Sequence, residues 1–266
     1  MAVNGGTRVM GYRWSDVPGS PRLRPGSVVV SSFPGAGLAT TVAAHYLIRS
    51  LKLPRVGLVE GSETPPVAVV QGGIVHPPVR VYGRDDLALI MSEFPPTPAQ
   101  ASQLAAAILD GAIERRARFV LCLEGVVPHP VEDGAASADD DPDMVWIVYA
   151  QRNPTVEKMF APARARLLED GVIGGVTGAL LVRAIPLEMP VATLLVSSRS
   201  PEGYPDHRAG AVLLETFDRL VPEASIDTAP IRAQAAQIER ILRQSMKPAA
   251  KAASPEAAPM PAEMYR

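Results

Sequence analysis

Apolar residues in the first third of the chain form short β-branched runs separated by one helical repeat. Residues 27–33 (SVVVSSF) have the composition of a buried strand, and residues 38–52 repeat apolar side chains at helical spacing. Strand-like stretches follow at residues 55–61, 67–75 and 87–94, with the short run VRVYG between the last two. The pattern predicts the order β-α-β-β-β-β.

The second half of the chain alternates helices and strands more regularly. Thr97, Pro98 and Gln100 have the types and spacing of a capping box with proline at the first helical position, which predicts a helix to about residue 117. The acidic stretch 132–143 is predicted to be a solvated loop. Apolar strands are expected at 119–126, 144–150 and 190–198, and helices from Asn153, within 173–189 and over 206–220.

A last amphipathic repeat and a change of composition mark the C-terminal part. Residues 230–246 place one apolar stripe at helical steps, made of Ile231, Ala235, Ile238, Leu242 and Met246. The Pro/Ala-rich residues 247–263 have no periodic apolar face and predict a flexible spacer.

These elements predict a layered α/β fold in which helices flank a largely parallel or mixed central sheet. We expect a flexible N-terminal lead over residues 1–25, a single α/β domain over 26–246 and a flexible tail over 247–266.

Composition and charge narrow the classes of function. The 266 residues are 47% hydrophobic and 20% charged, which permits an ordinary buried core. The net charge of −2, without a basic run, gives little support to nucleic-acid binding. We expect no membrane span and no signal peptide, because no apolar stretch is long enough. The single Cys122 suits a reducing compartment, and a cytoplasmic location is predicted.

Two glycine-rich segments are the first candidates for a ligand site. Gly35 and Gly37 follow the first strand and precede a helix, where backbone N–H groups can face an anion, but the Lys-Ser/Thr of a phosphate loop is missing. A tight structural turn is the favoured interpretation. Gly174, Gly175 and Gly178 allow either a ligand or a neighbouring element to approach the backbone, and close helix packing is the commoner reason.

Polar residues elsewhere give no pattern typical of catalysis or metal binding. The four histidines show no metal-ligand spacing, and no G-x-S-x-G elbow is present. Asp206 and His207 could form an acid/base pair, although Asp206 fits a helix cap better. The aspartates at 139–141 and 143 lack the glycine and glutamate of a calcium loop. We therefore predict a non-enzymatic protein with no catalytic residue, metal or cofactor.

The sequence ends in Met264, Tyr265 and Arg266, an aromatic ending that a purely solubilising tail does not need. A carboxylate, a ring and an apolar side chain can enter one pocket together. Residues 247–263 would give such a peptide a reach of about 20–25 Å on average as a random chain. An ordinary disordered end is the alternative interpretation.

Several segments taken in order resemble the proteasome assembly chaperone family, in its archaeal and actinobacterial branch. The resemblance lies in VVVSSFPGAGLATTVAAHYLIRSL, GGIVHPPVRVY, IMSEFPPTP, GGVTGALL and GYPDHRAGAVLLETF, and it runs from about residue 26 to residue 242. It implies an α/β fold like that of nucleoside phosphorylases and hydrolases, in proteins that act as chaperones or binding partners. It also implies a homo-oligomer.

The resemblance extends to the end of the sequence. Some archaeal members, and many proteasome activators, end in a hydrophobic-Tyr-any residue motif that inserts between α subunits of the core particle. Met264, Tyr265 and Arg266 match that motif, with Tyr265 as the anchor, Met264 as the apolar contact and the carboxylate of Arg266 as the partner of a lysine. The long Pro/Ala tail and the acidic insertion depart from the family pattern and affect the geometry on any ring.

Three functions remain open from the sequence. The leading hypothesis is a proteasome-binding protein, either an assembly chaperone or an activator or adaptor, that docks its C-terminal motif on α subunits. The alternative is a small-molecule enzyme or ligand-binding protein, with Gly35, Gly37, Gly174–Gly178 and His207 around a pocket. A third is an adaptor for another partner that uses the helix at 230–246.

Overall fold

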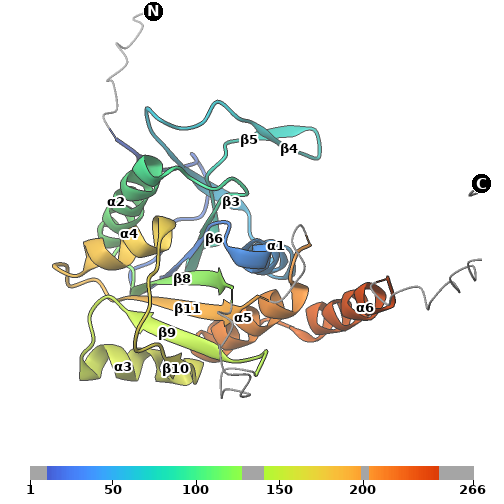
Figure 1. Cartoon of the computed structure of the whole chain (residues 1–266). Helices are drawn as coiled ribbons and strands as arrows, with labels where there is room; N and C mark the ends of the chain where they lie inside the picture. The colour runs from blue at the N-terminus through green and yellow to red at the C-terminus, as the bar shows by residue number, and fades with distance from the viewer. Residues whose placement is uncertain (1–10, 128–140, 199–203, 246–266) are drawn as a thin grey trace, which may run out of the picture.

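A nine-stranded mixed sheet forms the centre of the computed structural model, which describes residues 11–127, 141–198 and 204–245 (Figure 1). The strand order across it is β1-β3-β6-β7-β2-β8-β11-β9-β10. The strands are β1 (Arg13–Asp16), β2 (Val28–Ser32), β3 (Arg55–Glu60), β6 (Arg80–Arg84), β7 (Leu87–Met91), β8 (Phe119–Val126), β9 (Val145–Tyr149), β10 (Arg166–Leu167) and β11 (Val191–Ser197).

The middle of the sheet is parallel. Strands β7, β2, β8 and β11 run parallel to one another, whereas β6 pairs antiparallel with β7 and β9 pairs antiparallel with β11. At the far edge β10 pairs parallel with β9. From β2 the chain first builds the β7 side of the sheet and then crosses to β8 on the other side of β2. The carboxyl ends of β2 and β8 therefore lie at a topological switch point, where open α/β sheets commonly bind ligands.

Helices cover both faces of the sheet (Figure 1). Helices α1 (Ala39–Ser50) and α5 (His207–Leu220) pack together on one face, and α2 (Pro98–Glu114) and α4 (Gly175–Ala184) pack together on the other. The short helix α3 (Pro154–Phe160) lies near β10, and α6 (Ala229–Ser245) packs on α5. This arrangement confirms the layered α/β fold with a mixed central sheet that the sequence predicts.

Alternation along the central strands divides the core into two clusters. On β8, Phe119, Leu121 and Leu123 join the cluster beneath α1 and α5, whereas Val120 and Cys122 join the cluster beneath α2 and α4. Successive side chains of a strand point to opposite faces, so both faces of β8 are apolar, as expected of a buried parallel strand. The next residue on the α4 side is Glu124, which is where the apolar pattern stops.

Local signals fix the starts of two helices as predicted. Thr97 and Gln100 form a reciprocal capping box at α2, and Pro98 occupies the first helical position. Asn153 accepts the amides of Thr155 and Val156 at the start of α3. These caps satisfy N–H groups that have no partner within the helix.

Two predicted segments differ from the structure. Residues 13–16, expected to belong to a flexible lead, form β1, which pairs with β3 and buries Trp14. Residues 67–75, expected to be one strand, instead contribute to a separate hairpin of β4 (Val69–Gln71) and β5 (Ile74–His76). Gly72 and Gly73 turn this hairpin with positive φ, which glycine adopts without steric cost.

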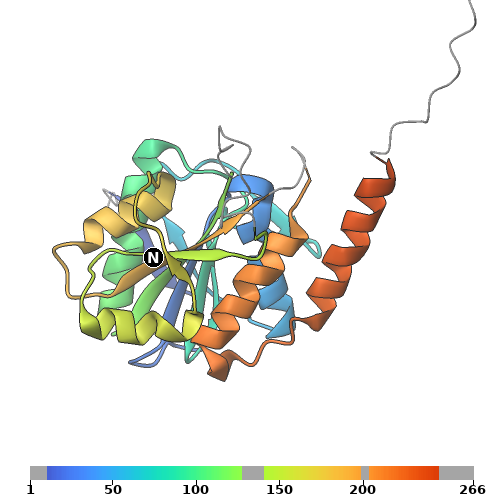
Figure 2. The same cartoon turned by 60° about the horizontal axis from the view of Figure 1, so that its bottom comes forward.

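Helix α6 lies at the edge of the molecule, beyond α5, and its C-terminal half extends away from the sheet (Figure 2). At the start of its predicted apolar stripe Ile231 and Ala235 are buried, whereas Leu242 and Met246 lie where no side chain is described. Ile238 is half-buried, and Ile241 is 52% exposed. Arg232 holds the first turns of α6 by a bidentate ion pair with Glu215 of α5. Its Nε donates to Oε1 at 2.5 Å and its Nη2 donates to Oε2 at 2.6 Å.

Candidate functional site

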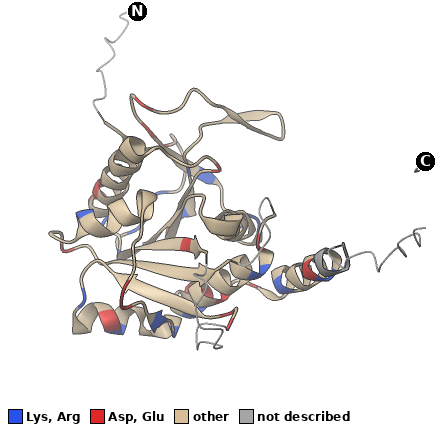
Figure 3. Ribbon diagram, viewed as in Figure 1, with Lys and Arg blue, Asp and Glu red and all other residues tan. Residues whose placement is uncertain are grey.

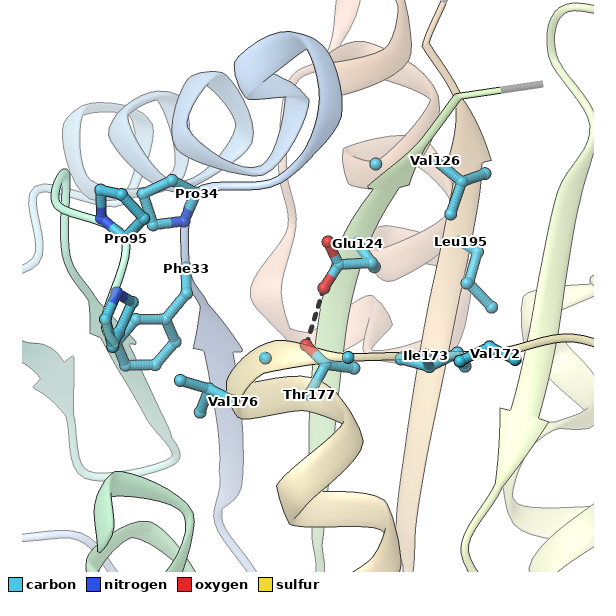
Figure 4. Close-up of a pocket in the computed structure, with 14 residues that line it drawn as sticks. Phe33, Pro34, Pro95, Glu124, Val126, Val172, Ile173, Val176, Thr177 and Leu195 are labelled. Atoms are coloured by element: carbon cyan, nitrogen blue, oxygen red, sulfur yellow. Dashed lines mark hydrogen bonds between the residues drawn. The ribbon is translucent and has the colours of Figure 1, made fainter. Parts of the chain in front are cut away.

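A pocket of about 310 Å³ opens at the switch point of the sheet, beside the N-terminus of α4 (Figure 4). One wall is formed by residues that follow β2 and β7, namely Phe33, Pro34, Pro95 and Pro96. The opposite side is formed by β8, by Leu195 of β11 and by residues 172–177 at the start of α4. Most of these side chains are apolar, as in typical small-molecule sites.

Glu124 places a carboxyl group between these walls (Figure 4). The hydroxyl of Thr177 on α4 donates a hydrogen bond to its Oε2 at 2.7 Å. Among the described lining residues, Glu124 is the one with an ionisable side chain, so no basic group of the lining compensates a negative charge there. The carboxyl group therefore stands among mostly apolar side chains, and within the described residues the Thr177 hydroxyl is its one hydrogen-bond partner.

Burial raises the pKa of Glu124 to about 7, because removal from water disfavours the charged carboxylate. The hydrogen bond from Thr177 acts in the opposite direction and lowers the pKa, but by less than burial raises it. The carboxyl group can thus take up or release a proton near neutral pH, which is a property common at binding and catalytic sites.

Glycines surround the site in three backbone segments. A Cβ on Gly35 would lie 2.3 Å from Oε1 of Glu124, so a larger residue in the turn after β2 would require this carboxyl group to move. A Cβ on Gly125 would lie 2.4 Å from the carbonyl oxygen of Ala36. Gly174 and Gly175 line the pocket with exposed backbone, and Gly175 begins α4 with φ +62°.

The other residues singled out in the sequence do not line the pocket. Gly37 has φ +59° and packs on Ser198 and Asp206, while Gly178 packs on the carbonyl of Ile173. Asp206 caps α5, where its Oδ1 accepts the amide of Ala209 at 2.8 Å. The capping interpretation of Asp206 is confirmed, and neither Asp206 nor His207 lines the pocket.

The described end of the acidic loop takes part in ion pairs. Asp143 lies 3.1 Å from Arg208 of α5 and 3.1 Å from Arg232 of α6, so it links two helices. This corrects the prediction that the whole stretch is merely solvated; Asp139 and Asp140 fall outside the described residues. No cluster of three or more metal-binding side chains occurs in the described part of the chain.

The remaining sequence predictions concern the cysteine, a membrane span and the C-terminal peptide. Cys122 is buried and unpaired, as expected of a thiol that packs as a small hydrophobe, and burial raises its pKa to about 12. None of the described helices combines the length and apolar character that crossing a bilayer requires. Met264, Tyr265 and Arg266, together with the spacer that precedes them, lie outside the described residues, so their docking role stays a prediction.

Sequence reasoning missed Glu124, although the chain carries a signal for it. A single carboxylate ends the apolar run FVLCLEG, directly before a glycine, at the carboxyl end of a predicted central strand. Burying a charge in such a run is costly unless it is paired or functional. The pairing with Thr177, 53 residues further along, becomes visible only when the chain is folded.

The fold and pocket define an α/β protein of the doubly wound type with a site at its switch point. Comparison with known families is more specific: the PAC2 family model matches residues 29–246, and the chain belongs to the PAC2 family. An uncharacterized protein of Methanocaldococcus jannaschii is 25% identical over 195 residues, which are 73% of this chain and 74% of that relative.

Two solved structures from Pyrococcus furiosus share the fold. PbaA, described as an archaeal homolog of proteasome-assembly chaperone, superposes with a TM-score of 0.70 and 22% identity, over 88% of this chain and 96% of PbaA. PbaB, described as an archaeal proteasome activator, gives a TM-score of 0.69 and 18% identity, over 88% of this chain and 98% of PbaB. At these identities the likeness demonstrates a common architecture.

Proposed function

We propose that this chain is a non-enzymatic proteasome-binding protein that docks Met264, Tyr265 and Arg266 onto the α subunits of the core particle. Membership of the PAC2 family carries the proposal, since the matched residues 29–246 include every described helix and most of the sheet. The chaperone-related and activator descriptions of the two P. furiosus proteins support it. Assembly of the α ring and activation or recruitment of the finished particle are the two forms this role can take.

The C-terminal tripeptide supplies the chemistry of docking. Tyr265 offers a flat, amphipathic ring, Met264 an adaptable apolar side chain, and the α-carboxylate of Arg266 a partner for a basic group. The described charges are mixed in sign on the helices and loops (Figure 3), which favours recognition by a specific peptide over attraction of one strongly charged surface to another.

Helix α6 gives the tripeptide a place from which to reach a partner. The helix is anchored by Ile231 and by the Arg232–Glu215 pair at its start, and it extends outward before residue 246. In a homo-oligomer, several such peptides would engage one ring and raise each other's effective concentration.

Docking is tested by mixing the purified protein with core particles and, separately, with isolated α subunits, and following co-migration on native gels or by light scattering. Deletion of residues 264–266 is expected to abolish binding to both forms. Tyr265→Phe keeps the ring and serves as the conservative control for Tyr265→Ala. Peptidase rates and the yield of assembled rings then separate activation from assembly.

A second variant tests the contribution of the C-terminal carboxylate to binding. A two-residue extension after Arg266 leaves all three side chains present but moves the charged terminus, and it is expected to weaken binding at least about tenfold. Unchanged binding of the extended or truncated chain would contradict terminal docking, and failure of the intact chain to bind either form would overturn the proposed function.

A further inference from the structure

The Glu124 pocket has a chemistry that the proposed proteasome role does not use. On the α4 face of β8, the preceding inward positions Val120 and Cys122 are buried and apolar, and Glu124 continues the same face. A neutral side chain could accept the Thr177 hydroxyl without the cost of burying a charge. A carboxyl group at this place is therefore better explained by something that enters the pocket than by packing alone.

The electrostatics of the pocket favour a cationic occupant. The described lining contains Glu124 and no lysine, arginine or histidine. Its nearest ionisable neighbour on the same strand face is the thiol of Cys122, which stays uncharged because its pKa is about 12. When Glu124 is ionised it offers only acceptor oxygens, and a carboxylate with so little compensation attracts a positive group that brings its own hydrogen-bond donors.

The volume of the pocket and the chemistry of its walls restrict the class of cation that fits. About 310 Å³ is near the lower limit for ligand pockets and fits a compact organic group. Apolar walls lie on both sides of Glu124, with Phe33, Pro34 and Pro95 on one side and Val126 and Leu195 on the other (Figure 4). Such walls suit a planar, weakly hydrated amidinium or guanidinium better than a compact ammonium or a metal ion that needs several oxygen ligands.

We infer that this pocket binds a small planar cation of the amidine or guanidine class, held by the carboxylate of Glu124 between the two apolar walls. The backbone at Gly174 and Gly175 and the fully exposed side chain of Val172 border the opening. Thr177 keeps the carboxyl group oriented by its hydrogen bond to Oε2, which leaves further acceptor capacity for the ligand.

Benzamidine is the probe, because it joins a flat apolar ring to an amidinium group. Benzamide and benzoate have nearly the same shape with neutral and negative head groups, and they serve as matched controls. Isothermal titration of the full chain at pH 8 is expected to detect benzamidine and not benzoate, with benzamide at least about tenfold weaker. Affinity should fall at pH 6, because the carboxyl group must lose its proton to form the pair.

Two sets of variants assign the binding to this pocket. Glu124→Gln is expected to weaken benzamidine binding at least about tenfold. Val172 is fully exposed, so Val172→Lys and Val172→Glu should both fold, and the lysine variant should bind benzamidine about two- to fivefold more weakly than the glutamate variant.

The inference is overturned if benzamidine fails to bind the folded wild-type chain at millimolar concentration. Binding that is insensitive to Glu124→Gln and to the charge at position 172 would equally contradict it, as would benzamide or benzoate binding as tightly as benzamidine. None of these outcomes bears on proteasome docking, which depends on residues 264–266.

Discussion

Glu124 carries a carboxyl group into a position that its neighbours on β8 fill with apolar side chains, and the energetic consequence depends on pH. Its pKa is about 7 in the folded chain and near 4.5 when exposed. Between these values the folded state holds more protons than the unfolded state, so the free energy of unfolding falls as pH rises from about 4.5 to 7. Above pH 7 the free energy of unfolding has lost the whole contribution of this group.

Glu124→Gln should remove this pH dependence. The quantity of interest is the unfolding free energy of the variant minus that of wild type. We expect this difference to be about 2 kcal/mol more positive at pH 8 than at pH 5, because wild type loses stability over this range. Urea denaturation at the two pH values measures the difference, and Glu157→Gln on the surface of α3 is the control. A difference between Glu124→Gln and wild type that does not change with pH would show that the carboxyl group is solvated.

Substitution by alanine should affect stability to different extents at two glycines of the same segment. A Cβ on Gly178 would lie 2.2 Å from the carbonyl oxygen of Ile173, so Gly178→Ala must shift the backbone and should destabilise the chain by about 1–3 kcal/mol. A Cβ on Gly174 meets no atom within 4 Å, and Gly174→Ala should stay within about 1 kcal/mol of wild type. Thermal unfolding compares the pair; equal losses would contradict the packing described.

Burial changes along the described side chains of helix α6, residues 229–241. Ile231 is 1% exposed, whereas Ile241 is 52% exposed. Ile231→Ala should cost about 2–4 kcal/mol and increase hydrogen exchange along the helix, while Ile241→Ala should change stability by less than about 0.5 kcal/mol. Comparable effects of the two substitutions would mean that the far half of the helix is also covered in solution.

Elements with strong local signals were predictable from the sequence. The capping box at Thr97 and the N-cap Asn153, each followed by proline at the first helical position, act within one turn, so they can be identified without tertiary structure. The β-branched runs of β2 and β11 are buried on both faces and read as continuous apolar segments. These segments position the sheet, and hence the layered fold.

Elements that depend on distant partners were not predictable in the same way. β1 is short and polar at its ends, and it becomes a strand because β3 supplies its ladder and α2 covers Trp14. The pocket combines the ends of β2, β7 and β8 with the start of α4, which lie far apart in the chain. Gly174 and Gly175 were singled out from sequence, but their proximity to Glu124 follows only from the topology.

At the scale of the whole molecule, proteasome docking by several peptides requires an oligomer. We expect light scattering of the purified chain to give a mass that is an integer multiple, above one, of 28.2 kDa. Affinity for a ring should then fall on dilution below the concentration at which the oligomer dissociates, because multivalency is lost. A monomer at micromolar concentration would contradict the multivalent form of the proposal.

The chain belongs to the PAC2 family and shares its fold with the two P. furiosus structures, and the terminal peptide gives the proposed proteasome-binding role a testable contact. The pocket at Glu124 is a separate feature of the same fold, about 310 Å³ in volume, and its ligand chemistry stands or fails independently. The two proposals depend on different residues, because the pocket is lined by Glu124 and its neighbours and docking depends on residues 264–266.

The most direct test is the dissociation constant of the intact chain for core particles, measured beside Tyr265→Ala and Tyr265→Phe at one salt concentration. We predict that the alanine variant binds at least about tenfold more weakly, while the phenylalanine variant stays closer to wild type. Equal dissociation constants for wild type and Tyr265→Ala, or no measurable binding of wild type, would contradict docking through the C-terminal peptide.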